Sequence, residues 1–245
     1  MLKSQAKKAK LPVTWTIGDV HNAFCRDGKE ADTFDAQKLV ESLKEREKEG
    51  LPFELRLTKE GELASVFWLS DSGFKHWAAL GEAKCVLYDT KHGTNRYKMK
   101  LGCWTVVDCN GITRIIAFSL IPPGESKEDF TWAFSQFRKH LGAPTVIFTD
   151  GDVGMAGAIA AVFGADGTVH LLCLYHVYTN LFGHLRKLFG ADTVAWRAFV
   201  DMFWRIAKRS DKLTIPKFEA EWARLTALAT ASTGSDEKTR KLALE

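Results

Sequence analysis

The chain has 245 residues, of which 46% are hydrophobic and 26% are charged, so it has the composition of a globular protein and enough length for a hydrophobic core. No apolar run approaches the roughly 18 residues of a membrane helix, and the lysine-rich residues 1–10 lack the apolar segment of a secretory signal. The net charge of +4 is a mild basic excess, and the five cysteines are scattered. We therefore expect no membrane partner and reduced thiols, as in a cytosolic or nuclear protein.

The first 66 residues predict two helices and a β-hairpin. A short helix is expected over residues 16–24. A second is expected over Thr33–Lys48, where apolar residues recur at helical spacing. Phe53–Thr58 and Leu63–Leu69 are apolar or alternating on either side of a four-residue turn, which is typical of a hairpin.

Three strands with short turns follow, predicted at Lys84–Tyr88, Leu101–Val107 and Ile112–Ile121. Strands joined by short turns form an antiparallel meander. Two later strands, at Thr145–Thr149 and Thr168–Leu174, are each reached through a helix and should be parallel to the first. This order predicts an α/β fold with a mixed sheet, in the pattern of ribonuclease H.

Helices are predicted after a cap at Ser126, over Val153–Phe163 and from the last strand to about residue 189. Beyond residue 190 apolar residues keep a helical spacing and no strand is indicated. We expect three regions: N-terminal helices and hairpin at 1–66, a ribonuclease H-like core at 67–190, and a helical segment at 191–245.

Asp89 and Asp150 are the main candidate site residues. Each is the first polar residue after an apolar predicted strand, and ligands of α/β sheets bind at the carboxyl ends of strands. If the two strands are parallel neighbours, the two carboxylates meet and suit Mg²⁺ or Mn²⁺, which support phosphoryl transfer. The alternative, that each aspartate forms a turn or caps a helix, has about equal weight.

Cys173 and His176 form a Cys-x-x-His pair, which is half of a Zn²⁺ site. The chain offers no convincing second half, such as Cys-x-x-Cys. A packed thiol next to a hydrogen-bonded histidine explains the pair equally well.

Basic residues gather in two stretches, residues 84–100 and residues 179–213. Such clusters suit contacts with DNA phosphates, and solvated helix faces account for them equally well. The candidates for DNA contact are Lys91, Arg96, Lys98, Arg186 and Lys187.

Several motifs in order resemble the transposase domain of Mutator-like elements, which far-red-impaired-response type plant regulators share. They are Val86–Thr90, Thr94–Met99, Ile147–Asp152 and Leu172–His176 with Asn180 one turn on. The resemblance implies a metal-dependent Asp-Asp-Glu transposase on a ribonuclease H-like core, with Asp89 and Asp150 as its first two acids. It also implies that Cys173 and His176 are the family's Cys-x-x-His pair, and that an insertion begins after residue 190.

One departure from that family matters. Its third acid lies in a Ser-Glu-x-x-Asn-like motif after a Phe-Glu-x-x-Trp helix, and this chain has the helix motif at Phe218–Trp222 but no such later motif. We therefore expect a truncated copy that cleaves little or no DNA alone. The alternative is a non-catalytic, domesticated DNA-binding or transcription-regulatory protein. A third hypothesis, with less support from the sequence, is a generic ribonuclease H-like nuclease. The expected partner is DNA, and a homo-oligomer is compatible with this prediction. The expected location is nuclear.

Overall fold

The computed structural model describes residues 35–81, 84–189, 193–209 and 212–232. The helix expected at 16–24 lies outside these residues. The chain divides into two compact units, the first ending at Cys173 and the second beginning at Leu174. None of the helices in the described ranges is long and apolar enough to cross a membrane.

The first unit opens with helix α3 (Asp35–Lys48) and the hairpin of β1 (Phe53–Leu57) and β2 (Leu63–Leu69), which confirms the predicted helix and hairpin. A short helix, α4 (Gly73–Ala79), was not predicted. Its first residue packs so closely on the sheet that a Cβ atom there would lie 2.0 Å from the carbonyl oxygen of Ile116. Glycine therefore lets α4 approach the sheet.

The predicted meander is present as β3 (Cys85–Lys91), β4 (Lys100–Val107) and β5 (Thr113–Ile121), paired antiparallel in that order. Helix α5 (Lys127–Leu141) follows, and a capping box starts it. In this box the Ser126 hydroxyl accepts the amide of Asp129, whose carboxylate accepts the amide of Ser126.

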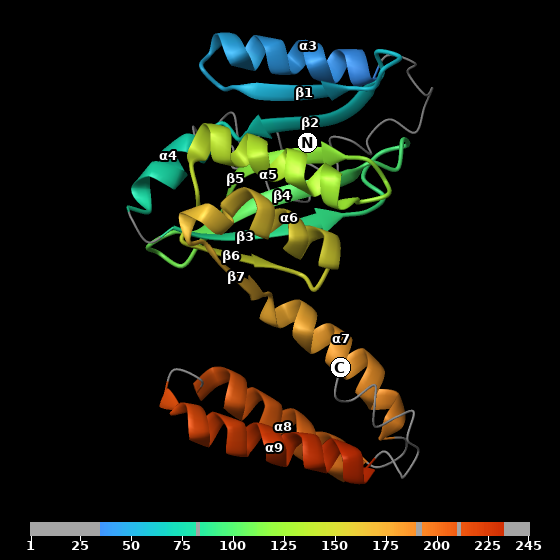
Figure 1. The fold of residues 1–245 in the computed structure, drawn as a ribbon, viewed down its shortest axis with the longest axis vertical. Coiled ribbons are helices and arrows are strands. Elements are labelled where there is room, and N and C mark those ends of the chain that lie inside the picture. Colours follow the sequence, from blue (N-terminus) through green and yellow to red (C-terminus); the bar gives the residue numbers. More distant parts are fainter. Residues whose placement is uncertain (1–34, 82–83, 190–192, 210–211, 233–245) are drawn as a thin grey trace, which may run out of the picture. The chain divides into compact units, whose positions relative to one another are not determined.

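The chain then forms β6 (Val146–Thr149), α6 (Val153–Phe163), a 3-10 turn at Gly164–Asp166 and β7 (Val169–Leu172). Strand β6 pairs parallel with β3, and β7 pairs parallel with β6. The seven strands lie in the order β1-β2-β5-β4-β3-β6-β7 (Figure 1). Three antiparallel strands followed by two parallel ones, reached through helices, make the ribonuclease H-like mixed sheet that the sequence predicts.

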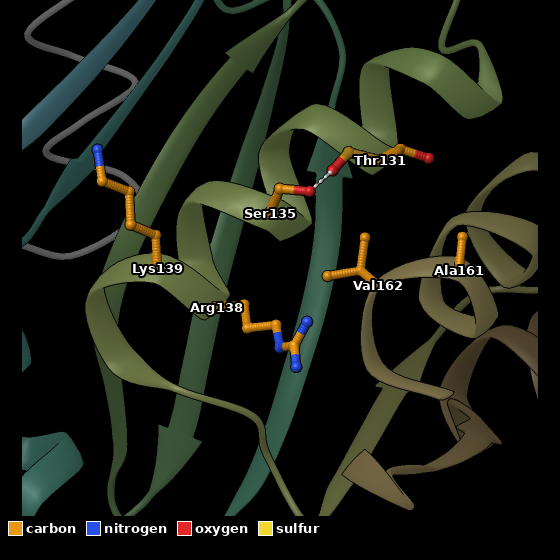
Figure 2. A pocket seen from close by; sticks show the side chains of 6 residues that line it. All are labelled: Thr131, Ser135, Arg138, Lys139, Ala161 and Val162. Atoms are coloured by element: carbon orange, nitrogen blue, oxygen red, sulfur yellow. Dashed lines mark hydrogen bonds between the residues drawn. The ribbon is translucent and has the colours of Figure 1, made fainter. Parts of the chain in front are cut away.

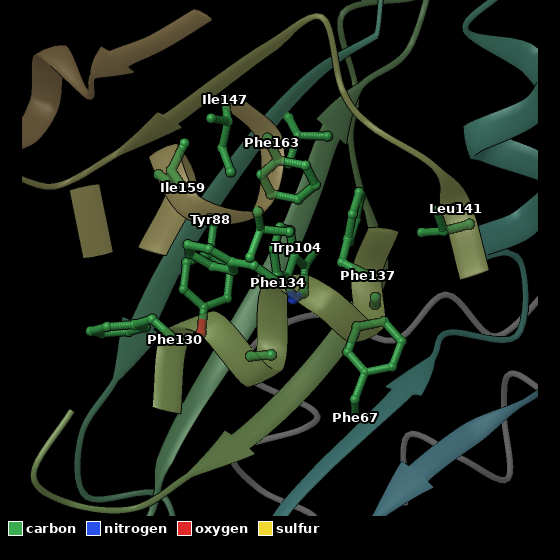
Figure 3. Packing of buried hydrophobic residues seen from close by; sticks show 14 of the residues in the cluster. Phe67, Tyr88, Trp104, Phe130, Phe134, Phe137, Leu141, Ile147, Ile159 and Phe163 are labelled. Carbon is green, nitrogen blue, oxygen red and sulfur yellow. The ribbon is translucent and has the colours of Figure 1, made fainter. Parts of the chain in front are cut away.

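The main core lies between the sheet and helices α5 and α6, and its centre is aromatic (Figure 3). The Trp104 ring stacks on the Phe137 ring with centroids 4.1 Å apart. The centroid of the Tyr88 ring lies 4.4 Å from that of Trp104. A second cluster covers the other face of the sheet, where Leu43 of α3 packs with Trp68 and Phe118. Residues that alternate along β3 to β6 therefore face one of two distinct sides.

The second unit consists of α7 (Leu174–Leu188), α8 (Thr193–Arg209) and α9 (Ile215–Ser232). It has its own cluster of buried residues, in which Phe182, Phe199 and Phe203 are prominent. The boundary between the two units falls within the region predicted as the core, 67–190, and the three predicted regions stay a prediction.

Candidate active site

Asp89 lies within β3. The sequence had predicted that the strand ends at Tyr88 and that Asp89 follows it. The strand continues to Lys91 because its pairing with β4 continues, with Asp89 opposite Cys103 and Lys91 opposite Leu101. The neighbours of Asp89 along the strand alternate in burial: Tyr88 is packed in the main core, whereas the Asp89 side chain is exposed. Asp89 therefore points to the face of the sheet that lacks α5 and α6.

Asp150 follows β6 directly and is half-buried. In the parallel pairing of β3 with β6, Val86 lies opposite Ile147 and Leu87 lies opposite Phe148. The same register carried two residues further places Asp150 level with Asp89 on strands about 4.8 Å apart. Both residues alternate with core-facing ones, so this register directs the two carboxylates to the same face of the sheet, Asp89 from within β3 and Asp150 from just after β6.

A tight turn orients the Asp150 carboxylate. Its Oδ1 atom accepts the backbone amide of Asp152 at 3.1 Å. Asp152 in turn accepts the amide of Met155 at 2.7 Å and caps α6. Asp150 is thus positioned by the turn that starts α6, and Asp152 caps that helix.

The side chains around the two aspartates set the local electrostatics. Burial raises the pKa of Cys103 to about 12, and the Asp89 carboxylate opposite adds to this rise. Burial also lowers the pKa of His170, and the negative charge of Asp150 counteracts part of that shift. The ring of His170 lies 2.8 Å from the Thr149 hydroxyl, which donates to the carbonyl of Asp150. At neutral pH the Cys103 thiol is therefore protonated and the His170 imidazole is uncharged.

Two adjacent carboxylates on rigid strands are the oxygen ligands that Mg²⁺ and Mn²⁺ prefer. The donor set of Asp89 and Asp150 therefore fits a hard divalent cation. Within the described ranges, no group of three or more His, Cys, Asp or Glu side chains is placed to hold a metal ion. A metal site at Asp89 and Asp150 therefore stays a prediction.

Sequence reasoning missed a third carboxylate at the same edge of the sheet, Glu125. Thr90 donates a hydrogen bond of 2.7 Å to its Oε1 atom, and the Lys100 ammonium lies 3.4 Å from its Oε2 atom. Because Thr90 alternates with Asp89 along β3, Glu125 binds on the opposite side of the strand. No local signal in the sequence marks Glu125, since its partners come from β3 and β4.

The predicted DNA-contact residues fall into two groups that belong to different units. Lys91 ends β3, while Arg96 and Lys98 lie in the loop before β4, and all three are exposed. Arg186 and Lys187 lie in the last turn of α7, where the Arg186 guanidinium stands 5.5 Å from the Trp196 ring centroid. The first group lies at the edge of the sheet that carries Asp89, and its contact with DNA stays a prediction.

The Cys-x-x-His pair spans the division of the chain. Cys173 is the last residue of the first unit, and its amide donates to the carbonyl of Thr149 at 2.6 Å. His176 lies in the first turn of α7 in the second unit. A Zn²⁺ site at this pair stays a prediction.

An open hollow of about 440 Å³ lies on the outer side of α5 and α6, away from the predicted site (Figure 2). Its polar groups are engaged within the protein. The Ser135 hydroxyl donates to the carbonyl of Thr131, and Arg138 and Lys139 form ion pairs with Asp166 and Glu54. The hollow therefore offers no group that points to chemistry.

Comparison with known proteins gives one family. Residues 85–180 match the family model described as the MULE transposase domain, which confirms the Mutator-like resemblance for this part of the chain. No curated protein matches the chain.

Solved structures give distant likenesses. The HTLV-2 integrase catalytic core domain, solved in complex with magnesium, is 21% identical, with 44% of this chain and 69% of that chain covered and a TM-score of 0.30. The catalytic core domain of BIV integrase is 13% identical, with 66% and 94% covered and a TM-score of 0.29. The assignment of a ribonuclease H-like sheet does not use these two structures. It depends on the strand order and directions in this chain.

Proposed function

We propose that the MULE transposase domain at residues 85–180 is the DNA-processing core of a transposase-type nuclease, with Asp89 and Asp150 as its metal-binding acids. The observation that carries this proposal is the parallel pairing of β3 with β6, whose printed register ends at Leu87 and Phe148 and, carried two residues further, leads to Asp89 and Asp150. A bound divalent cation would supply Lewis-acid activation for attack on a phosphodiester.

The chain's own residues perform the other tasks. Strand β3 carries Asp89, Asp150 follows the neighbouring strand β6 directly, and the Asp152 amide orients the Asp150 carboxylate. Lys91, Arg96 and Lys98 lie at the same edge, where they can bind the phosphates on either side of the reacting one. DNA affinity should then fall steeply with salt, since phosphate contacts release counterions.

A metal-binding experiment tests the site directly. We expect Mg²⁺ or Mn²⁺ to raise the melting temperature of the whole chain, since a ligand that binds the folded state stabilises it. Asp89→Asn and Asp150→Asn should each abolish most of this rise, whereas Glu125→Gln, whose carboxylate lies on the other side of β3, should preserve it. An equal rise in all four proteins would contradict the proposal.

The second candidate function is that of a domesticated DNA-binding or transcription-regulatory protein. It is favoured by the lack of a third metal-binding side chain beside Asp89 and Asp150 among the described residues. A nicking assay distinguishes the two functions. Mg²⁺-dependent nicking that Asp89→Asn abolishes would establish the nuclease, while salt-dependent binding without nicking would favour the regulatory protein.

Two further properties belong to the proposal. A protein that acts on chromosomal DNA works in the nucleus, which imaging of a fluorescently tagged chain in a eukaryotic cell would test. Cutting two ends of an element requires two active sites, so we infer that the chain forms a homo-oligomer on DNA. Sedimentation of the chain with and without DNA would test this.

A further inference from the structure

The loop of residues 92–99, which joins β3 to β4, is held closed by its own side chains. Asn95 binds the backbone of Met99 twice: its amide nitrogen donates to the Met99 carbonyl at 2.8 Å, and its amide oxygen accepts the Met99 amide at 3.1 Å. Thr94 is buried, with 2% of its surface exposed. The base of the loop is the strand pair at Lys91 and Leu101. Its tip is therefore presented in a fixed position.

The tip displays an aromatic ring between two cations. Tyr97 is 46% exposed. The guanidinium of Arg96 lies 4.9 Å from the centroid of its ring and donates to its hydroxyl at 2.7 Å. Lys98 follows with φ of +57°, and its amide donates to the carbonyl of Asn95. This left-handed residue closes the turn and keeps Arg96, Tyr97 and Lys98 on the outside of the loop.

Tyr97 does not contribute to a hydrophobic core, which is the usual role of a tyrosine ring. It belongs to none of the three buried clusters of the described structure, and about half of its surface is in water. The contact with Arg96 reduces the freedom of the ring, so that less entropy is lost when a planar ligand stacks on it. The loop leaves β3 three residues after Asp89, at the edge where both aspartates lie.

We propose that Tyr97 is a base-stacking residue, which binds an unpaired nucleotide of the DNA beside the two aspartates. The inference depends on the proposed function and specifies its substrate: DNA with an unpaired end, in preference to blunt duplex. Aromatic rings stack on any base whose face is accessible, and paired bases inside a duplex cover their faces with one another. Arg96 and Lys98 supply the positive charge that the adjoining phosphates need.

Fluorescence anisotropy with the whole chain tests the inference. The probes are a blunt DNA hairpin and the same hairpin with a short unpaired 3′ tail, at one fixed salt concentration. We expect the chain to bind the tailed hairpin about tenfold more tightly, the size of one stacked base. Tyr97→Ala should remove this preference, and Tyr97→Phe should keep it because phenylalanine also stacks. A 2-aminopurine in the tail should lose fluorescence on binding to the wild-type chain and to Tyr97→Phe, but not on binding to Tyr97→Ala.

The matched control is Phe74→Ala. Phe74 is an exposed aromatic residue, 57% accessible, in α4. Helix α4 follows β2, which runs antiparallel to β3, so it lies at the opposite edge of the sheet. This variant should keep the full preference for the tail, and thermal melts should show that both alanine variants are folded.

The outcomes separate this inference from the proposed function. A tail preference that persists in Tyr97→Ala, or equal binding of both hairpins by the wild-type chain, would overturn the inference. Salt-dependent binding of the blunt hairpin would still support the proposed function in either case. Failure to bind both hairpins would contradict the inference and the proposed function together.

Discussion

Thr90 and Glu125 connect the strand of the candidate site to the loop before α5. The Thr90 hydroxyl donates to Glu125 Oε1 at 2.7 Å, and Lys100 lies 3.4 Å from Oε2. Glu125 itself has φ of +48°, a left-handed conformation that costs a residue with a side chain about 1 kcal/mol. These interactions, together with His92 Nε2 at 3.9 Å from Oε2, thus hold a strained backbone next to Asp89.

This relationship predicts an unusual order of stability at position 125. Glu125→Ala should lower the free energy of unfolding by about 2 kcal/mol, because it removes the carboxylate's side-chain interactions and keeps the strain. Glu125→Gly removes the same interactions but relieves the strain, so it should recover about 1 kcal/mol of that loss. Urea denaturation of the three proteins measures both differences. A glycine variant less stable than the alanine variant would show that the backbone is not strained.

The N-terminus of α5 should be much more sensitive at Asp129 than at Ser126. Asp129 is 8% exposed, and it accepts hydrogen bonds from Ser126 while pairing with Arg56 of β1. Ser126→Ala should cost about 1 kcal/mol, the usual value for a helix cap. Asp129→Ala should cost about 3 kcal/mol, because it also leaves the Arg56 charge without its partner.

A double variant supplies the control for Asp129. The Nε atom of Arg56 is buried without a hydrogen-bond partner, so an apolar side chain of similar length should be tolerated there. Adding Arg56→Met to Asp129→Ala should therefore recover part of the lost unfolding free energy. If the losses of unfolding free energy from Asp129→Ala and from Arg56→Met add in the double variant, the ion pair with Arg56 does not explain the cost of losing Asp129.

The stability of the chain should decrease in acid partly through Glu54. Burial raises the pKa of Glu54, but hydrogen bonds from Lys139 and His140 outweigh that effect and leave it below its usual value of 4.5. A carboxyl with a lowered folded pKa stabilises the protein above its unfolded pKa, and this contribution disappears as the pH falls through the folded value. Glu54→Gln should thus lower the free energy of unfolding by up to about 1 kcal/mol at neutral pH.

The pH profile is the discriminating measurement for Glu54. The wild-type chain and Glu54→Gln should converge in stability as the pH is lowered from neutral to about 3, since the protonated acid then resembles the amide. A difference that stays constant over this range would mean that the charge of Glu54 contributes nothing.

The sequence predicted most of this fold because its signals are local. The Ser126 cap, the glycine after α5 and the apolar run before Asp150 each mark an element by residue type and spacing. The end of β3 was misplaced at Tyr88, because the polar stretch from Asp89 to Lys91 belongs to the strand only through its pairing with β4. Glu125 could not be found for the same kind of reason, since its role depends on partners distant in the chain. The level placement of Asp89 and Asp150 required the register between β3 and β6, which spacing alone does not give.

The last prediction concerns the packing beneath the candidate site. Gly102 of β4 faces Tyr88 and Ser119, whose hydroxyls lie 3.2 Å apart in the core. A Cβ atom at position 102 would lie 2.3 Å from each hydroxyl oxygen, far inside contact distance. Gly102→Ala should therefore cost about 2–3 kcal/mol of unfolding free energy, because a close-packed interior adjusts only with strain.

Removing the obstructing hydroxyls should identify the cause of that loss. In the Tyr88→Phe, Ser119→Ala background, both oxygens that the new Cβ atom would meet are absent, so Gly102→Ala should cost at least about 1 kcal/mol less. Urea denaturation of the four proteins gives this coupling as a double-mutant cycle. An unchanged cost would mean that the two hydroxyls are not the cause, and would point to the ring carbon Cε2 of residue 88, which lies 2.7 Å from the Cβ position and remains in phenylalanine, or to the backbone of β4.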